Sequence, residues 1–194
     1  GLITPYAAFE LITALKQDPG LPVQALAARL SERANLAARD ITHVFLTTFR
    51  PDVCRGISLF ENARWLLHGV EREAVGVPLA QRLREAVHRD EEEGQDQELL
   101  EAIRRDVAIL KRCEAAPDSI ADRVDLFPLP GVTPGACGLL IEEPRHTTLI
   151  CGDAIPTGQF IEEGKVPQDA FDLDKAKGSF EEAIEIADLL IPGR

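Results

Sequence analysis

The chain of 194 residues lacks several features that would place it in a class of protein at once. No run of about 18 apolar residues occurs, so no membrane-spanning helix is expected, and no basic-then-apolar start resembles a secretion signal. No basic tract occurs, and 33 acidic against 21 basic residues give a net charge of −12. Nucleic acid is therefore not an expected partner. Methionine is absent throughout, which is expected of a processed or shortened chain.

The composition that is present indicates a globular protein. Hydrophobic residues make up 45% and charged residues 28%, a balance that favours one folded domain over 1–194. The four cysteines show no Cys-x-x-Cys spacing, and a chain of this length does not need disulfides to fold. We therefore predict buried free thiols and a reducing, cytoplasmic location. The cysteines are Cys54, Cys113, Cys137 and Cys151.

Helical and strand-like hydrophobic patterns are interspersed, which predicts a mixed α/β fold with helices on the faces of a sheet. One helix is expected to begin at Pro5 and end before Asp18, and another to begin at Pro22. Ser179 with Glu182 matches a capping box and predicts that the last helix begins there, with Phe180, Ala183, Ile184 and Ala187 facing inward. Strands are expected over 43–47, 63–68, 123–127, 137–142, 147–152 and 188–191, with a hairpin turn at 143–145.

Residues 78–116 are predicted to form a helical hairpin inserted between the strands. Pro78 suits the first position of a helix, and a charge run separates two apolar stripes. Because a lone hairpin has one internal interface, some apolar surface remains for other contacts. We expect the hairpin to pack beside the strand-end loops and to contribute to a homodimer. The stripes are Leu79, Leu83 and Val87, then Leu99, Ile103, Val107 and Leu110.

Polar loops follow four of the predicted strands, which is where α/β proteins collect their functional groups. The loops read TTFRPDVCRG over 47–56, PGVTPG over 130–135, GD over 152–153 and PGR over 192–194. In this order they resemble the metallo-β-lactamase-fold superfamily, whose motifs are T-H-x-H-x-D-H, P-G-H-T-P-G, G-D and P-G-H. The resemblance covers residues 40–68 and 123–194. It implies an αβ/βα sandwich whose first strands would precede Gly1.

The chain departs from the superfamily pattern at the positions that bind metal. The resemblance implies one or two metal ions held by five His and two Asp, and of these only the aspartates remain here. Valine has no lone pair and arginine repels a cation, so no zinc or iron site is expected. Two carboxylates and a hydroxyl could still hold Mg²⁺ or Ca²⁺ weakly. The matching positions are Thr48, Arg50, Asp52, Val53, Val132, Asp153 and Arg194.

An ion-pair network is the expected substitute for the metal. Two facing buried carboxylates need a cation or protons to compensate them, and a guanidinium can bridge both. We therefore expect Arg50 to pair with Asp52 and Asp153. In the alternative, Arg50 points to solvent and the aspartates cap backbone amides. Thr48, Thr133 and Arg194 are the candidate residues for binding a small molecule.

The sequence leaves three functions open, because one fold serves many activities. The first is a relative of the superfamily's hydrolases without metal or other cofactor, which binds a small molecule, oligomerises or is catalytically silent. The second is a hydrolase of ester, lactone, thioester or phosphodiester substrates, with Asp52 or Asp153 as base and Arg50 as anion anchor. The third is an enzyme that uses Mg²⁺ or Ca²⁺ bound weakly at Asp52 and Asp153.

Overall fold

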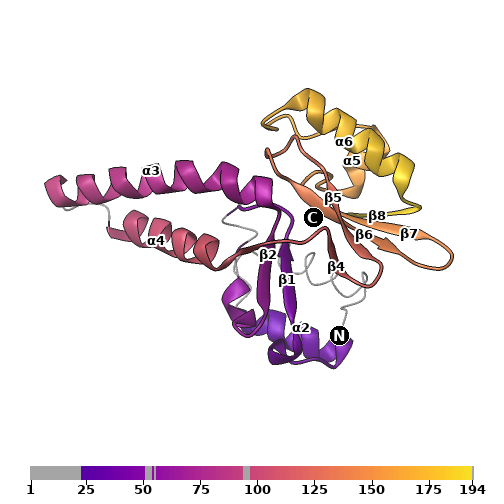
Figure 1. The fold of residues 1–194 in the computed structure, drawn as a ribbon, viewed down its shortest axis with the longest axis horizontal. Coiled ribbons are helices and arrows are strands. Elements are labelled where there is room, and N and C mark those ends of the chain that lie inside the picture. The colour runs from indigo at the N-terminus through magenta and orange to yellow at the C-terminus, as the bar shows by residue number, and fades with distance from the viewer. Residues whose placement is uncertain (1–22, 51–53, 55, 94–96, 194) are drawn as a thin grey trace.

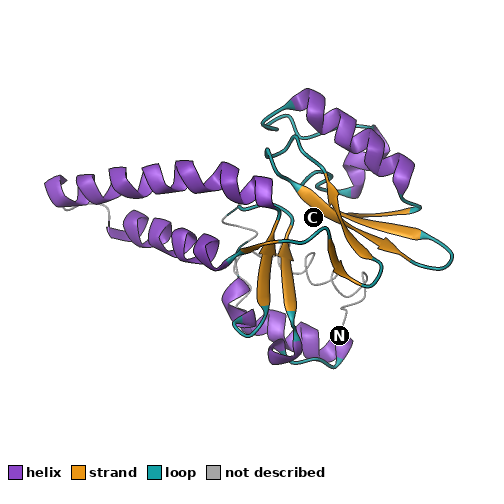
Figure 2. Ribbon diagram, in the orientation of Figure 1, coloured by secondary structure: helices purple, strands orange, loops and turns teal. Residues whose placement is uncertain are grey.

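The computed structural model describes residues 23–50, 54, 56–93 and 97–193. These residues form two sheets with helices packed against them, as Figures 1 and 2 show. The expected mixed α/β class is thereby confirmed. The helix predicted to begin at Pro5, and the candidate residues Asp52, Val53 and Arg194, lie outside the described residues.

The first sheet is parallel and has the strand order β1-β2-β3. The strands predicted over 43–47 and 63–68 are confirmed as β1 and β2, whereas the two-residue β3 is too short to give a sequence pattern. Arg112, at the end of the hairpin, lies 3.9 Å above the Trp65 ring and attaches the hairpin to β2. The elements are α2 (Val23–Ala34), η1 (Ala38–Asp40), β1 (His43–Leu46), η2 (Ile57–Phe60), β2 (Arg64–Leu67) and β3 (Glu114–Ala115).

The second sheet has the order β4-β5-β6-β7-β8. Its pairs are antiparallel except for β7 and β8, which run parallel. The predicted turn between β6 and β7 is confirmed, since Glu143 N donates to His146 O at 3.0 Å. The strands are β4 (Ser119–Ala121), β5 (Val124–Pro128), β6 (Cys137–Glu142), β7 (Thr147–Gly152) and β8 (Leu189–Pro192).

Helices α5 (Gly158–Glu163) and α6 (Leu173–Ile186) cover one face of the second sheet (Figure 1). The capping box predicted at Ser179 is wrong. The α6 helix begins six residues earlier, where the Asp172 carboxylate accepts a hydrogen bond from Lys175 N at 3.1 Å. This earlier start moves Ser179 into the middle of the helix, where it is buried. Ile184, predicted to face inward, is 47% exposed.

The hairpin consists of α3 (Gly69–Glu93) and α4 (Gln97–Arg112). The prediction that Pro78 begins the first helix is wrong, because α3 begins at Gly69 and continues through the proline. Proline fits the first turn of a helix, whereas inside a helix it removes one internal hydrogen bond and its ring crowds the carbonyl one turn earlier. The α3 helix continues through Pro78 in spite of this cost. On α4 the inward position is Leu100 rather than Leu99, which is 37% exposed.

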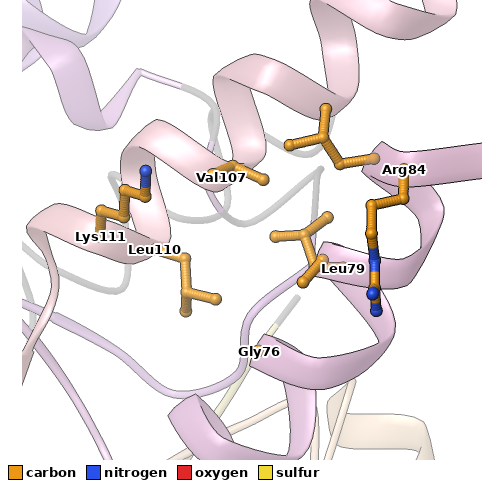
Figure 3. A pocket seen from close by; sticks show the side chains of 8 residues that line it. Gly76, Leu79, Arg84, Val107, Leu110 and Lys111 are labelled. Carbon is orange, nitrogen blue, oxygen red and sulfur yellow. The ribbon is translucent and has the colours of Figure 1, made fainter. Parts of the chain in front are cut away.

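The hairpin extends away from the two sheets (Figure 1). The first turn of α3 contacts the strand-end loops through Glu71, but this turn precedes the predicted hairpin. The prediction that the hairpin over 78–116 packs beside those loops is wrong. Between the two helices lies an open groove of about 510 Å³ (Figure 3). Its lining is largely apolar and consists of Gly76, Leu79, Ala80, Leu83, Arg84, Val107, Leu110 and Lys111.

In the described part of the chain, no helix is long and apolar enough to cross a membrane.

Candidate functional site

The loops that follow β1, β7 and β8 meet at one place, as the sequence predicted. Gly152 ends β7 with φ +56°, and a Cβ there would lie 2.4 Å from Thr47 Oγ1. A Cβ on Gly193, just after β8, would lie 2.3 Å from Gly152 O. Gly193 N also donates to Ile155 O at 3.0 Å. Glycine is favoured at position 152 because its φ is positive and the Thr47 side chain fills the space beside it. At position 193 the backbone of Gly152 approaches too closely for a side chain.

The region where these loops meet also connects the two sheets. Cys137 N, at the start of β6, donates to Thr47 O, just after the end of β1, at 3.0 Å. The loop after β1 therefore lies against strands of the second sheet. Polar side chains from both sheets can meet there, although they are far apart in the sequence.

Asp153 is the central charged group of this place. Its side chain is 3% exposed, and its Oδ2 lies 3.4 Å from Thr48 Oγ1 and 3.9 Å from Arg50 Nε. Thr48 is fully buried, whereas Arg50 is 35% exposed. A buried carboxylate needs hydrogen bonds or a countercharge, and these neighbours supply both. The predicted network is thus present for Arg50 and Asp153, and its Asp52 member lies outside the described residues.

A second carboxylate, Glu71 in the first turn of α3, holds the neighbouring loops together. Its side chain is fully buried. Glu71 Oε1 accepts from Phe49 N at 2.9 Å, and Oε2 accepts from Thr133 Oγ1 at 2.7 Å and from Gly135 N at 3.0 Å. The hydroxyl of Thr133, a candidate for ligand binding, is therefore a donor to Glu71 in this structure.

Glu71 is not among the residues predicted from the sequence, because the helix was expected to begin at Pro78. An available signal was an acidic residue just after an apolar strand, at a place where a helix could begin. Carboxylates are favoured in the first turn of a helix, because its backbone N–H groups point toward them. An earlier helix start would have placed Glu71 in that turn.

The loop over 130–135 is held from two sides. On one side, a Cβ on Gly135 would lie 2.0 Å from Glu71 N, and the Gly135 carbonyl lies 3.1 Å from His68 Nδ1. On the other side, Ser179 Oγ donates to Pro130 O at 2.7 Å. A Cβ on Gly131, with φ +137°, would lie 2.3 Å from Ala176 N. The buried serine thus attaches α6 to this loop.

The side chains of the described residues do not form the ligand set of a zinc site. Within those residues, no three His, Cys, Asp or Glu side chains are grouped so that they could hold a metal ion. Zinc takes a tetrahedral set of nitrogen, sulfur or oxygen ligands, whereas Asp153 has a hydroxyl and a guanidinium beside it. Burial raises the pKa of the neighbouring Cys151 to about 12, so this thiol is not ionised near neutral pH.

Comparison with known proteins identifies the family. The profile described as Metallo-beta-lactamase superfamily matches residues 18–192, and the chain belongs to this superfamily. The resemblance stated from the loop motifs is thereby confirmed, and the two-sheet fold agrees with it. No curated protein matches the chain.

Several solved structures share the fold at low sequence identity. AidC, a dizinc quorum-quenching lactonase in complex with a product, has a TM-score of 0.60 and 20% identity over 82% of this chain. An N-acyl homoserine lactone hydrolase with its product bound at the catalytic metal centre has a TM-score of 0.56 and 21% identity over 85%. A Thermotoga maritima protein assigned to the metallo-beta-lactamases has a TM-score of 0.59 and 18% identity over 89%. The chain spans 57%, 60% and 75% of their respective lengths.

Proposed function

We propose that this protein binds a small anionic molecule at the strand-end site, without tightly bound zinc or iron. The observation that carries the proposal is the pairing of Arg50 with the buried Asp153. A guanidinium at this position places a permanent positive charge where the superfamily motif has a histidine ligand. Guanidinium groups bind carboxylates and phosphates in a planar, bidentate manner. Partial exposure of Arg50 gives a small anion access to that charge.

A hydrolase is the second candidate, and the burial of Asp153 beside Thr48 and Arg50 favours it. In this case Asp153 would act as general base, and Arg50 would stabilise negative charge that develops on an ester, lactone, thioester or phosphodiester. A weakly bound Mg²⁺ at Asp52 and Asp153 is the remaining form of this proposal. The structural neighbours include lactonases, and their level of identity supports the shared fold.

Metal content and anion binding test the first proposal. Protein purified without chelator is expected to carry less than about one equivalent of zinc or iron. Inorganic phosphate is expected to bind to the wild type and to lose most of its affinity in Arg50→Ala. The control Arg145→Ala removes an exposed arginine from the β6–β7 turn and should leave binding unchanged. Stoichiometric zinc or iron, or equal binding by both variants, would contradict the proposal.

An activity panel separates the two candidates. Esters, lactones, thioesters and phosphodiesters would be assayed with and without added Mg²⁺. Turnover that is lost in Asp153→Asn supports the hydrolase, whereas absence of turnover together with phosphate binding supports the binding protein. Turnover that requires added Mg²⁺ supports the weakly bound metal.

We also propose that the α3–α4 hairpin contacts a second copy of the chain. The groove between the helices is apolar, and the cations Arg84 and Lys111 lie at it. Acidic side chains on the same hairpin, Glu98 and Glu101, are available to pair with those cations across a two-fold axis. Sedimentation of the wild type and of variants that place a charge on the exposed hairpin surface tests this proposal.

A further inference from the structure

Glu71 joins two loops that are far apart in the sequence and belong to the same site. Its Oε1 accepts from the loop that carries Thr48 and Arg50, and its Oε2 accepts twice from the loop over 130–135. Each carboxylate oxygen therefore accepts hydrogen bonds from one of the two loops. The carboxylate lies in the first turn of α3, so the base of the hairpin is part of the same arrangement.

The chemistry of the donors calls for a side chain with two acceptor oxygens at this position. Two of the three donors are backbone N–H groups, which cannot accept a hydrogen bond in return. Full burial removes water as an alternative partner, so each donor that lost its acceptor would stay unsatisfied. The N-terminal end of α3 favours a negative charge there. Three donors and the helix end together compensate the burial of Glu71.

We infer that Glu71 is a positioning residue, whose two carboxylate oxygens fix the Arg50-bearing loop against the Thr133-bearing loop. Phe49 is the residue directly before Arg50, so the bond to Phe49 N fixes the backbone from which the guanidinium extends. The orientation of Arg50 toward Asp153 thus depends on Glu71, although the three hydrogen bonds of Glu71 go to other groups. This inference concerns the loops and holds for either proposed function of the site.

Glu71→Gln tests the inference with almost no change in shape. An amide keeps one acceptor but replaces the other oxygen with an N–H₂ donor, so one loop loses its acceptor. Amide hydrogen exchange at Phe49 or Gly135 is expected to accelerate about tenfold or more, while amides of β6 stay protected. Glu73→Gln, on an exposed position two residues later, should change neither. Equal exchange in Glu71→Gln and the wild type would overturn the inference, as would acceleration spread evenly over the protein.

A second variant covers the case in which Glu71→Gln does not fold. Thr133→Val removes one donor to Glu71 and leaves the carboxylate in place. If Glu71 couples the two loops, exchange should rise severalfold at Phe49 N, on the other loop, as well as at Gly135 N. No change at Phe49 would contradict the coupling.

Phosphate affinity gives an independent readout. If the site binds anions, Glu71→Gln should weaken phosphate binding about tenfold through misplacement of Arg50, while Glu73→Gln should not. If the wild type binds phosphate and Glu71→Gln binds it with unchanged affinity, the positioning role is overturned. A wild type that binds no phosphate would contradict the proposed function alone, since the exchange measurement tests Glu71 without any ligand.

Discussion

Arg50 Nε lies 3.9 Å from Asp153 Oδ2, so a cation from the loop after β1 pairs with a buried carboxylate at the end of β7. The pair is asymmetric, because Asp153 is almost inaccessible to water whereas Arg50 is partly exposed. Removing the arginine would leave a buried charge with fewer partners, while removing the aspartate would leave a cation that water can solvate. Substitutions at the two positions should therefore differ in their effect.

A double-mutant cycle on this pair gives the first prediction. Arg50→Ala is expected to lower the free energy of unfolding by about 1–2 kcal/mol, a value reduced from that of a fully buried pair by the exposure of the guanidinium. In the presence of Asp153→Asn the same substitution should cost less, with a coupling energy of about 0.5–2 kcal/mol. Urea unfolding of the wild type, both single variants and the double variant measures it. Additive changes would mean that the two side chains do not interact.

A glycine comparison gives the second prediction. A Cβ at position 135 would lie 2.0 Å from the backbone N of Glu71, and a backbone atom of a helix cannot move away cheaply. Gly135→Ala should therefore destabilise the protein by about 3 kcal/mol or more. A Cβ on Gly178, inside α6, would meet no atom within 4 Å among the described residues. Gly178→Ala should stabilise by about 0.5–1 kcal/mol, because alanine favours helix.

Thermal unfolding measures both glycine variants. The two substitutions add the same methyl group, so general effects of alanine are matched between them. Similar melting temperatures for the two variants would contradict the close approach of the 130–135 loop to α3.

Periodicity predicted the fold where elements are long or directly follow a turn signal. The strands over 137–142 and 147–152 match β6 and β7 at both ends. The helix starts were wrong where a local signal outweighed the tertiary context. Pro78 fits a first turn in isolation, yet α3 begins at Gly69, where its first turn can reach the loops through Glu71. Short elements such as β3 depend on a partner strand and have no pattern of their own.

The candidate site was predictable in part for a similar reason. Loop motifs indicated that the strand ends converge, and Arg50 with Asp153 confirms this. The partner of Thr133 was not predictable, because Glu71 is 62 residues away in the sequence and no spacing rule links a buried carboxylate to the loops it joins.

The third prediction concerns the pH dependence of stability. Burial raises the pKa of Cys113 to about 11 and the pKa of Cys137 and Cys151 to about 12, from an ordinary value of 9.0. Between pH 9 and 10 these thiols ionise in the unfolded chain but stay largely protonated in the folded one. The unfolded state then binds fewer protons, so the free energy of unfolding should fall as pH rises through this range.

Urea unfolding at pH 8, 9 and 10 measures this slope. Cys151→Ala should make the decrease smaller, since it removes one of the contributing thiols. The same three thiols should react slowly with a disulfide reagent at pH 8 in the folded protein and rapidly after unfolding. Rapid labelling of the native protein at these positions would contradict their burial.

The last prediction concerns the association of the hairpin. Val77 is 73% exposed on α3, and Leu99 is exposed on α4. If a second copy covers the groove and these side chains, sedimentation at micromolar concentration should show a dimer. Leu99→Glu and Val77→Glu should shift it to monomer with little change in unfolding free energy, because neither side chain lies in the core.

Ile186→Glu provides the matched control for this experiment, since it adds the same charge at an exposed apolar position at the end of α6. It should leave the dimer intact, because α6 covers the second sheet while the hairpin extends away from it (Figure 1). Raised salt should weaken the dimer as well, if Arg84 and Lys111 pair with acidic side chains of the second copy. A monomer at all concentrations would mean that the groove between α3 and α4 is not covered by a second copy.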